Sequence, residues 1–333
     1  MTANDCLPCT AILSLLAIAL VSLSYPLIAQ EPAAPNTAPP ARPAKPAWHA
    51  PRARHALLLD VAETPDGLVA VGEHGIVLLS EDRLEWRQAN AVPVSVALTA
   101  VTFSGRLGWA VGHDGVIIAS TDGGENWTIQ HRDTAWGWPL LDVLFLSPSH
   151  GFAIGSYGTA FETEDGGAHW LKRELLPELD WHLNAMLAVD PSHLFIAGEQ
   201  GYGYRSTDQG KTWEEVNLPY DGSMFGAVVA GNEIIAFGLR GHVFVSRDFG
   251  TSWTDADPGP TDSLFGGKRL SDGRVVLVGA KGRILLRPAQ GGAFQASVDE
   301  SGRDLSAVAE QATGELILFG EGGVQSLTVA KGQ

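Results

Sequence analysis

The chain has 333 residues, with 22 Lys and Arg against 38 Asp and Glu, so its formal net charge is −16 at pH 7. Phosphate groups are bound mainly through Lys and Arg, so this balance argues against nucleic acid or an anionic membrane surface as a partner. Both cysteines, Cys6 and Cys9, precede residue 10. We therefore expect no disulfide, no thiolate metal site and no cofactor in the part that follows.

The chain opens with an apolar stretch over residues 11–23, which is too short to span a bilayer comfortably. Pro26 and a small residue, Ala29, follow it, as in a secretory signal with its cleavage site. We predict that residues 1–29 are a signal peptide and that the protein is periplasmic or secreted. Asp5 stands where a basic residue is usual, so an uncleaved segment tethered to the inner membrane is the alternative.

A proline-rich segment comes next, from residue 30 to residue 47. Its prolines are Pro32, Pro35, Pro39, Pro40, Pro43 and Pro46. Such a composition cannot build a packed core, so we predict an extended linker. One repeat domain then occupies residues 48–333.

Seven Gly-x-x-Gly turns recur along this domain at steps of 40, 43, 43, 40, 41 and 41 residues. They begin at Gly72, Gly112, Gly155, Gly198, Gly238, Gly279 and Gly320. A period near 40 in a strand-like sequence indicates a solenoid or a propeller. Four short runs can be read in residues 98–130, joined by three tight connections, so each period predicts a four-stranded antiparallel meander.

A second motif decides between these two architectures. The pattern Ser-x-Asp-x-Gly-x-x-Trp begins at Ser120, Ser206 and Ser246, and Thr163 opens a close variant. This is the Asp-box, a turn between the two outer strands of a propeller blade. Ser and Asp side chains accept hydrogen bonds from nearby backbone N–H groups, and Gly takes a backbone angle that other residues resist. We expect the Trp ring to pack between neighbouring sheets.

Counting blades predicts how the ring closes. The box Trp lies 15 residues after the first Gly of its blade; Phe294 stands at this spacing in blade six, and Trp86 stands 14 residues after Gly72 in blade one. Blade seven would need an aromatic residue near position 335, beyond Gln333. We therefore expect residues 48–52 to supply its outer strand and remove an exposed edge. The predicted fold is an all-β, seven-bladed β-propeller of four-stranded antiparallel blades, closed by an N-terminal strand.

One face of this propeller carries the candidate site. The Gly-x-x-Gly turns and the blade-to-blade crossings share the face where the innermost strands begin, and several crossings carry aromatic residues that no blade requires. Exposed Trp and Tyr beside polar groups are typical interface anchors, although such rings also cap inter-blade cores. The predicted partner-binding residues are His113, Asp114, Trp136, Trp138, Tyr157, Trp181, His182, Glu199, Tyr220 and Arg240.

Catalysis is the alternative to binding, because glycosidases also carry Asp-boxes. A sialidase needs three arginines that converge on a carboxylate, and only Arg240 lies in the mouth-facing turns. A glucanase-like enzyme needs two opposed carboxylates, for which Asp114 with Glu73 or Glu199 are candidates. We expect no enzyme, since scattered surface acids are the simpler interpretation in an acidic chain. A non-catalytic glycan-binding propeller would use the same Trp residues and remains a third reading.

The repeats and boxes, together with residues 108–112 (Gly-Trp-Ala-Val-Gly), resemble the photosystem II stability and assembly factor family of seven-bladed Asp-box propellers. The likeness covers about residues 48–330 and includes relatives in bacteria with no photosystem. It implies a monomeric, chaperone-like binding factor that assists the assembly, stability or function of a membrane or envelope protein complex, with a transporter among the candidates. The acidic chain lacks a dense arginine patch, so a photosystem partner is not expected.

Overall fold

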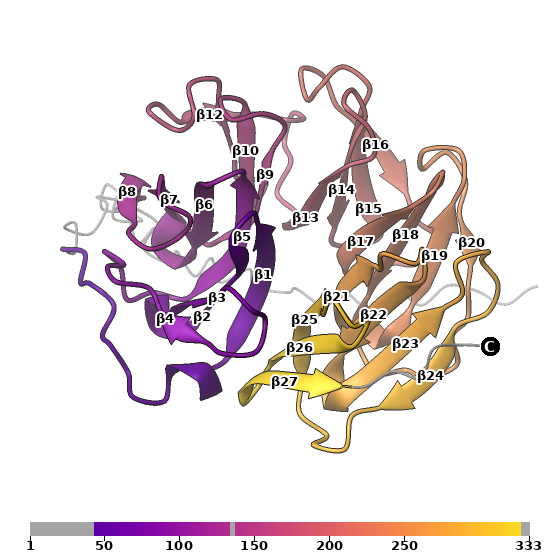
Figure 1. Cartoon of the computed structure of the whole chain (residues 1–333). Helices are drawn as coiled ribbons and strands as arrows, with labels where there is room; N and C mark the ends of the chain where they lie inside the picture. The colour runs from indigo at the N-terminus through magenta and orange to yellow at the C-terminus, as the bar shows by residue number, and fades with distance from the viewer. Residues whose placement is uncertain (1–42, 134–136, 328–333) are drawn as a thin grey trace, which may run out of the picture. The chain divides into compact units, whose positions relative to one another are not determined.

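The computed structural model describes residues 43–133 and 137–327. Within them the chain forms seven antiparallel sheets that follow one another along the sequence (Figure 1). Six sheets have four strands in sequence order, and the last has three. The predicted all-β, seven-bladed propeller is confirmed. In the described residues no helix is long and apolar enough to cross a membrane.

Each sheet is one blade, with its first strand innermost. Blade one contains β1 Leu58–Thr64, β2 Gly67–Gly72, β3 Val77–Ser80 and β4 Arg87–Gln88. Blade two contains β5 Leu98–Ser104, β6 Leu107–Gly112, β7 Val116–Ser120 and β8 Thr128–His131. Blade three contains β9 Leu140–Phe145, β10 Gly151–Gly155, β11 Ala160–Thr163 and β12 Leu171–Arg173. Blade four contains β13 Leu183–Ala188, β14 Leu194–Gly198, β15 Tyr202–Ser206 and β16 Glu214–Asn217.

The remaining blades keep this order. Blade five contains β17 Met224–Ala230, β18 Glu233–Gly238, β19 Val243–Ser246 and β20 Thr254–Asp255. Blade six contains β21 Leu264–Arg269, β22 Val275–Gly279, β23 Arg283–Arg287 and β24 Gln295–Val298. Blade seven contains β25 Leu305–Glu310, β26 Leu316–Gly320 and β27 Gly323–Leu327. Short 3₁₀ turns stand at η1 Ala53–His55, η2 Glu73–Gly75, η3 His113–Gly115, η4 Leu239–Gly241 and η5 Ala280–Gly282.

Seven hydrophobic cores stabilise the ring, one between each pair of neighbouring blades. The middle strands are buried on both faces, which explains the apolar runs without alternation in the sequence. The box Trp of each blade enters the core that it shares with the preceding blade, as expected. Trp127 is 3% exposed there, and Phe103 contacts its ring edge-on with centroids 6.0 Å apart.

The Ser-x-Asp turns have the predicted hydrogen bonds. In blade two Ser120 Oγ accepts the Gly124 N–H at 2.9 Å, and Asp122 Oδ1 accepts the Asn126 N–H at 3.0 Å. Trp127 Nε1 donates to the Gly124 carbonyl at 2.8 Å, which fixes the ring. Gly124 has φ +96°, a left-handed angle that favours glycine. All three bonds recur at Ser206, and the Ser and Asp bonds recur at Ser246, so these residues build the blade edge.

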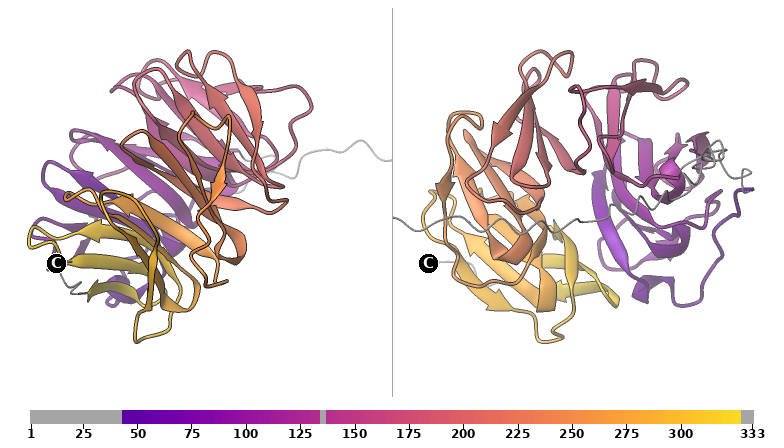
Figure 2. Two further views of the ribbon diagram at one scale, coloured as in Figure 1. Left: turned by 90° about the vertical axis from the view of Figure 1, so that its right-hand side faces the viewer. Right: turned by 180° about the vertical axis from the view of Figure 1, so that it is seen from behind.

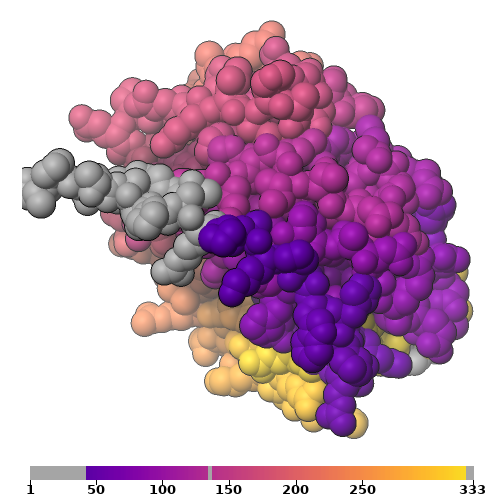
Figure 3. Space-filling view, turned by 90° about the vertical axis from the view of Figure 1, so that its left-hand side faces the viewer, coloured from indigo at the N-terminus to yellow at the C-terminus, as the bar shows by residue number. Residues whose placement is uncertain are grey.

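The ring closes differently from the sequence-based prediction. Residues 48–52 form no strand, and Trp48 is 79% exposed. Gln88 Nε2 of blade one donates to the Trp48 carbonyl at 2.9 Å, so this segment follows the outer strand of blade one, not of blade seven. In the space-filling view the indigo N-terminal segment crosses the purple blades and reaches the yellow last blade (Figure 3). The predicted closing strand is therefore wrong.

Side-chain packing closes the ring instead. One core joins blades one and seven, and in it Trp86 contacts Phe319 edge-on with ring centroids 5.5 Å apart. η1 contributes the buried Ala53 to this core and lies against β27. Gln311 Nε2 of blade seven donates to the Arg83 carbonyl at 2.7 Å. Trp86 and Phe319 thus bury apolar surface between the first and last blades, and packing joins these blades although blade seven has three strands.

The innermost strands add a second set of ties around the channel. Each carries a bulge near its start. At the bulges Asp60 accepts the Val101 N–H of the next blade at 2.9 Å, and Asp142 accepts that of Met186 at 2.6 Å. At three other bulges a side chain donates a hydrogen bond to a backbone carbonyl of the next blade; these side chains are Thr99, Asn184 and Ser306. At the border of blades five and six, Phe225 and Phe265 face each other instead, with ring centroids 5.8 Å apart. Figure 2 shows the succession of blades from two further directions.

The two channel carboxyl groups have shifted pKa values. Burial by the channel walls raises the pKa of Asp60 from 3.8 to about 6 and that of Asp142 from 3.8 to about 7. The negative charge of Asp60 contributes further to the rise at Asp142. Backbone N–H groups that donate to the two carboxylates lower both pKa values, but the loss of hydration on burial raises them by more.

A glycine substitution tests the closure of the ring. Gly323 has φ +87°, and a Cβ there would lie 1.8 Å from the Arg54 carbonyl oxygen, whereas Gly231 has φ +65° with nothing within 4 Å. Gly231→Ala should lower the free energy of unfolding by about 1 kcal/mol, through backbone strain alone. Gly323→Ala should lower it by roughly 2–4 kcal/mol, because the segment before β1 is also displaced. Equal losses in urea titrations would contradict this closure.

The channel carboxyl groups predict a pH dependence of stability. Because their folded-state pKa values exceed 3.8, the folded protein retains protons that the unfolded chain loses between about pH 4 and 7. Their contribution to stability should therefore fall as the pH rises from about 4 to about 7. His131 opposes this, since burial lowers its pKa, so the difference between wild type and Asp60→Asn plus Asp142→Asn is the proper measure. Identical pH profiles of the melting temperature would refute the assignment.

Candidate functional site

One backbone contact recurs at all seven Gly-x-x-Gly turns. The N–H of the residue after the first glycine donates to the carbonyl that precedes the innermost strand of the same blade, at 2.8–3.2 Å. In blade one Glu73 donates to Leu57 at 3.0 Å, and a Cβ on Gly72 would lie 2.0 Å from that carbonyl oxygen. The first glycine is required because the backbones approach so closely. The two variable residues between the glycines form the rim of the channel.

The third residue of each turn has a left-handed backbone angle, with φ between +54° and +88°. These residues are His74, Asp114, Tyr157, Gln200, Arg240, Lys281 and Gly322. The rim is chemically uneven, since acids and His gather on blades seven, one and two, whereas Arg240 and Lys281 stand on blades five and six. Tyr157 of blade three is 47% exposed and is the aromatic member of this set.

Around Tyr157 the structure brings together several of the predicted residues. Its ring contacts Trp138 with centroids 5.1 Å apart, and it meets His182 edge-on at 4.9 Å. His182 Nδ1 lies 3.3 Å from Glu199 Oε1, and the backbone N–H of His182 donates to Glu199 Oε2 at 3.0 Å. This aromatic sector therefore spans the turns of blades three and four and the crossings that lead to them.

Trp181 extends the sector. It is 41% exposed, and its ring stacks on Tyr202 with centroids 6.1 Å apart and an interplanar angle of 20°. The Trp181 carbonyl accepts the Gly158 N–H at 2.9 Å, which ties the crossing to the turn of blade three. Tyr202 was missed by the sequence analysis, because it follows a turn glycine and begins the strand β15. The exposed rings of Tyr157 and Trp181, on backbone held by this hydrogen bond, suit a binding surface.

The other described residues of the prediction make no ring contact with this sector, although the turn of Asp114 lies against the crossing that carries Trp138. Tyr220 lies against His242 with ring centroids 3.9 Å apart and packs on the core of blades four and five. Tyr220 therefore caps the core between two blades, which was the alternative to partner binding for these aromatic residues. Asp114 forms an ion pair with Arg132 at 2.8 Å, beside the exposed His113. Arg240 is exposed on blade five, and Trp136 lies outside the described residues.

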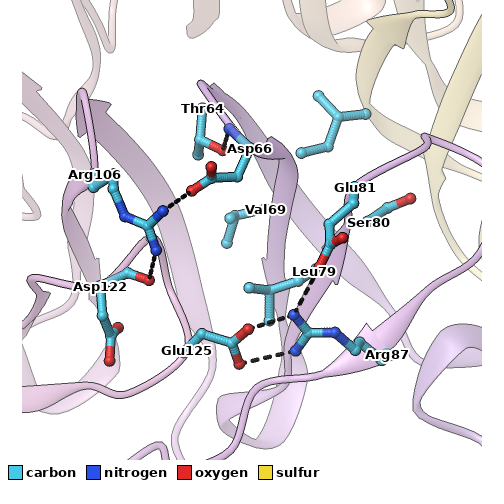
Figure 4. A pocket seen from close by; sticks show the side chains of 12 residues that line it. Thr64, Asp66, Val69, Leu79, Ser80, Glu81, Arg87, Arg106, Asp122 and Glu125 are labelled. Carbon is cyan, nitrogen blue, oxygen red and sulfur yellow. Dashed lines mark hydrogen bonds and ion pairs between the residues drawn. The ribbon is translucent and has the colours of Figure 1, made fainter.

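A cavity at the opposite end of blades one and two holds two arginines (Figure 4). Arg106 Nη1 contacts Asp66 Oδ2 at 2.8 Å, and Arg87 Nη1 donates to Glu125 Oε2 at 2.8 Å. Glu81 lies 3.4 Å from the same Arg87 guanidinium. Since carboxylates of the protein already neutralise both guanidinium groups, this cavity joins two blades and does not resemble an anion site.

Metal chemistry has no support in the part of the chain that the structure describes. No group of three or more His, Cys, Asp or Glu side chains is arranged there to hold an ion. The three carboxylates considered for catalysis each contact a neighbour on the rim: Glu73 accepts the Leu57 N–H at 3.0 Å, Asp114 pairs with Arg132, and Glu199 accepts the His182 N–H.

Several solved propellers share the fold. A YCF48 bound to a D1 peptide aligns with a TM-score of 0.67 at 17% identity, over 90% of this chain and 99% of that chain. YCF48 from Cyanidioschyzon merolae gives 0.64 at 17% identity, over 86% and 98%. A streptogramin B lyase gives 0.69 at 11% identity, over 83% and 94%. At these identities the likeness concerns the fold alone.

Sequence comparison is more specific. No curated protein sequence matches the chain. The sequence model of one protein family, described as photosynthesis system II assembly factor YCF48, matches residues 130–332. The match runs from the outer strand of blade two through the five blades that follow, including the aromatic sector. Because it covers more than half of the chain, this protein belongs to the YCF48 family of assembly factors.

Proposed function

We propose that this protein is an exported, non-catalytic propeller that binds protein and assists the assembly, stability or function of a membrane or envelope complex. One observation carries the proposal: the exposed rings of Tyr157 and Trp181 stand on backbone that hydrogen bonds hold in place. Rigid aromatic side chains lose little conformational entropy on binding and often dominate the binding energy of an interface.

The family supports a peptide-binding role. A relative has been solved with a D1 peptide, which is a precedent for a propeller of this fold that recognises a segment of another protein. For this chain we propose a different partner, since its net charge is −16. A membrane or envelope protein complex, with a transporter among the candidates, is the partner class, and we propose that the protein acts as a monomer.

Export is the second element of the proposal, and it depends on residues 1–29, outside the described part of the chain. Pro43 lines a cavity with Asp114 and Arg132 on the rim. An uncleaved N-terminal segment would keep the propeller close to a membrane partner and raise the effective concentration of its candidate site.

Catalysis is the alternative function, and one structural neighbour, a streptogramin B lyase, is named as an enzyme. Two observations favour binding. Glu73, Asp114 and Glu199 are all engaged by rim groups of the protein itself. The rim of blades seven, one and two is also acidic, which would repel anionic sugars such as sialic acid. A non-catalytic glycan site on Trp181 and Tyr202 is the third possibility that the experiments address.

The first experiment measures partner capture. After crosslinking in native membranes, wild type should recover one envelope complex, and Tyr157→Ala plus Trp181→Ala should lose it, since hot-spot truncations cost about 2 kcal/mol or more each. Trp48→Ala is the matched control, because Trp48 is 79% exposed but lies off the rim. Recovery unchanged in the double variant, or lost equally in the control, would rule out the aromatic sector as the binding site.

A second experiment separates packing from binding. Trp127→Ala should lower the free energy of unfolding by about 3–5 kcal/mol, because it empties the core between blades one and two. Trp138→Ala should cost far less, since the ring is only half-buried, but it should weaken partner capture through the lost contact with Tyr157. Comparable losses of stability would mean that Trp138 is structural.

A third experiment tests for chemistry. Purified protein should not turn over sialosides or β-glucans, and Asp114→Asn should change nothing in such assays. Were Asp114 a general acid, its replacement should reduce turnover about 10²–10⁴-fold. Turnover that disappears in Asp114→Asn would establish the enzyme in place of the binding protein. Binding of neutral glucans that Trp181→Ala abolishes would favour the glycan-binding reading.

A further inference from the structure

The channel contains a second candidate site, away from the aromatic sector. Two cavities of about 380 and 330 Å³ share the lining residues Leu59, Thr99, Phe225, Phe265 and Ser306, so they are successive parts of one space. The first is reached from the rim, because Asp304 and Glu321 of blade seven line it. The second lies along the innermost strands and includes Asp60 and Asp142.

The first cavity forms an apolar collar. Phe225 and Phe265 form one wall, and Leu57 and Leu59 contribute the other apolar side chains. Phe265 is 36% exposed, so part of this surface is accessible from the channel. Its outer edge is acidic, since Asp304 and Glu321 stand there. A ligand that enters here must offer an apolar stem, and a positive charge on it would suit the acidic edge.

The second cavity is a chamber with two carboxyl groups. Each Asp60 oxygen accepts one backbone N–H, from Val61 at 2.8 Å and from Val101 at 2.9 Å. Asp142 is held in the same way by Val143 and Met186. Lys268 also lines the chamber, but its Nζ lies 3.0 Å from Glu63 Oε1 at the far end of β1. The side chains that face the chamber therefore carry more acid than base.

We propose that the channel mouth accepts a lysine side chain of a bound protein, with the aliphatic stem in the collar and the ammonium group at the carboxylates of Asp60 and Asp142. The stem would pack on Phe225 and Phe265, as long cationic side chains commonly do on apolar surfaces. This site is distinct from the rings of Tyr157 and Trp181, and the proposal does not depend on which envelope complex they bind.

Lysine suits the chamber better than arginine. A guanidinium group binds most strongly when one carboxylate presents both oxygens in a fork. Here both oxygens of Asp60 and of Asp142 already accept a backbone N–H. A compact ammonium group with three rotatable donors can instead take a remaining lone pair from each carboxylate.

Peptide binding tests the proposal directly. Two blocked pentapeptides are compared, with lysine or norleucine between pairs of glycines, and binding is followed by the NMR shifts of the Val61, Val101 and Met186 amides. The lysine peptide should bind at least about tenfold more tightly, because hydrogen bonds to charged groups contribute most. Its affinity should rise between pH 5.5 and 8 as Asp60 and Asp142 ionise, with Glu63, Lys268, Asp304 and Glu321 as the other charged groups at the channel.

Variants locate the site. Asp60→Asn and Asp142→Asn should each weaken the lysine peptide several-fold and leave the norleucine peptide unchanged. Phe265→Ala, at a partly exposed position, tests the collar if the Asp variants fold poorly, and Leu171→Ala, 67% exposed on blade three, is the control. Equal binding of both peptides, or shifts away from the channel, would overturn the proposal. If pentylamine bound as tightly as the lysine peptide, the lysine of a bound protein would be the wrong ligand and the channel would be a site for small amines.

Discussion

The hydrogen bond from the turn after the second strand to the residue that precedes the first strand is the interaction on which the rest of the structure depends. It occurs in all seven blades at 2.8–3.2 Å. It requires a glycine where the two backbones meet, because a Cβ on Gly72 or Gly279 would lie 2.0 Å from the opposing carbonyl oxygen. The same contact that explains the repeated glycine also positions the rim.

Because the glycines and the backbone hold the turn, the two residues between the glycines are available for function. The hydrogen bond to the first strand holds their backbone whatever side chain they carry, so the rim is acidic at Glu73, basic at Arg240 and aromatic at Tyr157, although Arg240 and Tyr157 adopt left-handed angles that favour glycine. Crossings such as that of Trp181 are tied to the same turns. Loops that a rigid scaffold positions in this way are common places for binding residues. The channel differs, because there the first strands themselves supply the side chains.

The ring depends on packing as much as on pairing. Each border between blades has its own core, and the border between the first and last blade is no exception, since Trp86 and Phe319 meet there. Around the channel the bulge residues add polar ties at most borders, whereas Phe225 and Phe265 leave one border apolar. Burial of Asp60 and Asp142 at these ties makes the same groups that join blades sensitive to pH.

The period of about 40 residues determined the fold, because each repeat must bury its faces against the next. The four strands predicted within residues 98–130 are present as β5 to β8. The closing strand was wrong, because counting residues cannot show that Trp86 and Phe319 already bury the last interface. Trp138, Tyr157, His182 and Glu199 were found from their places in turns and crossings, but only the tertiary structure brings them into contact. Tyr202, Phe225 and Phe265 were missed because a strand residue reveals which wall it faces only once the blades are arranged around the channel.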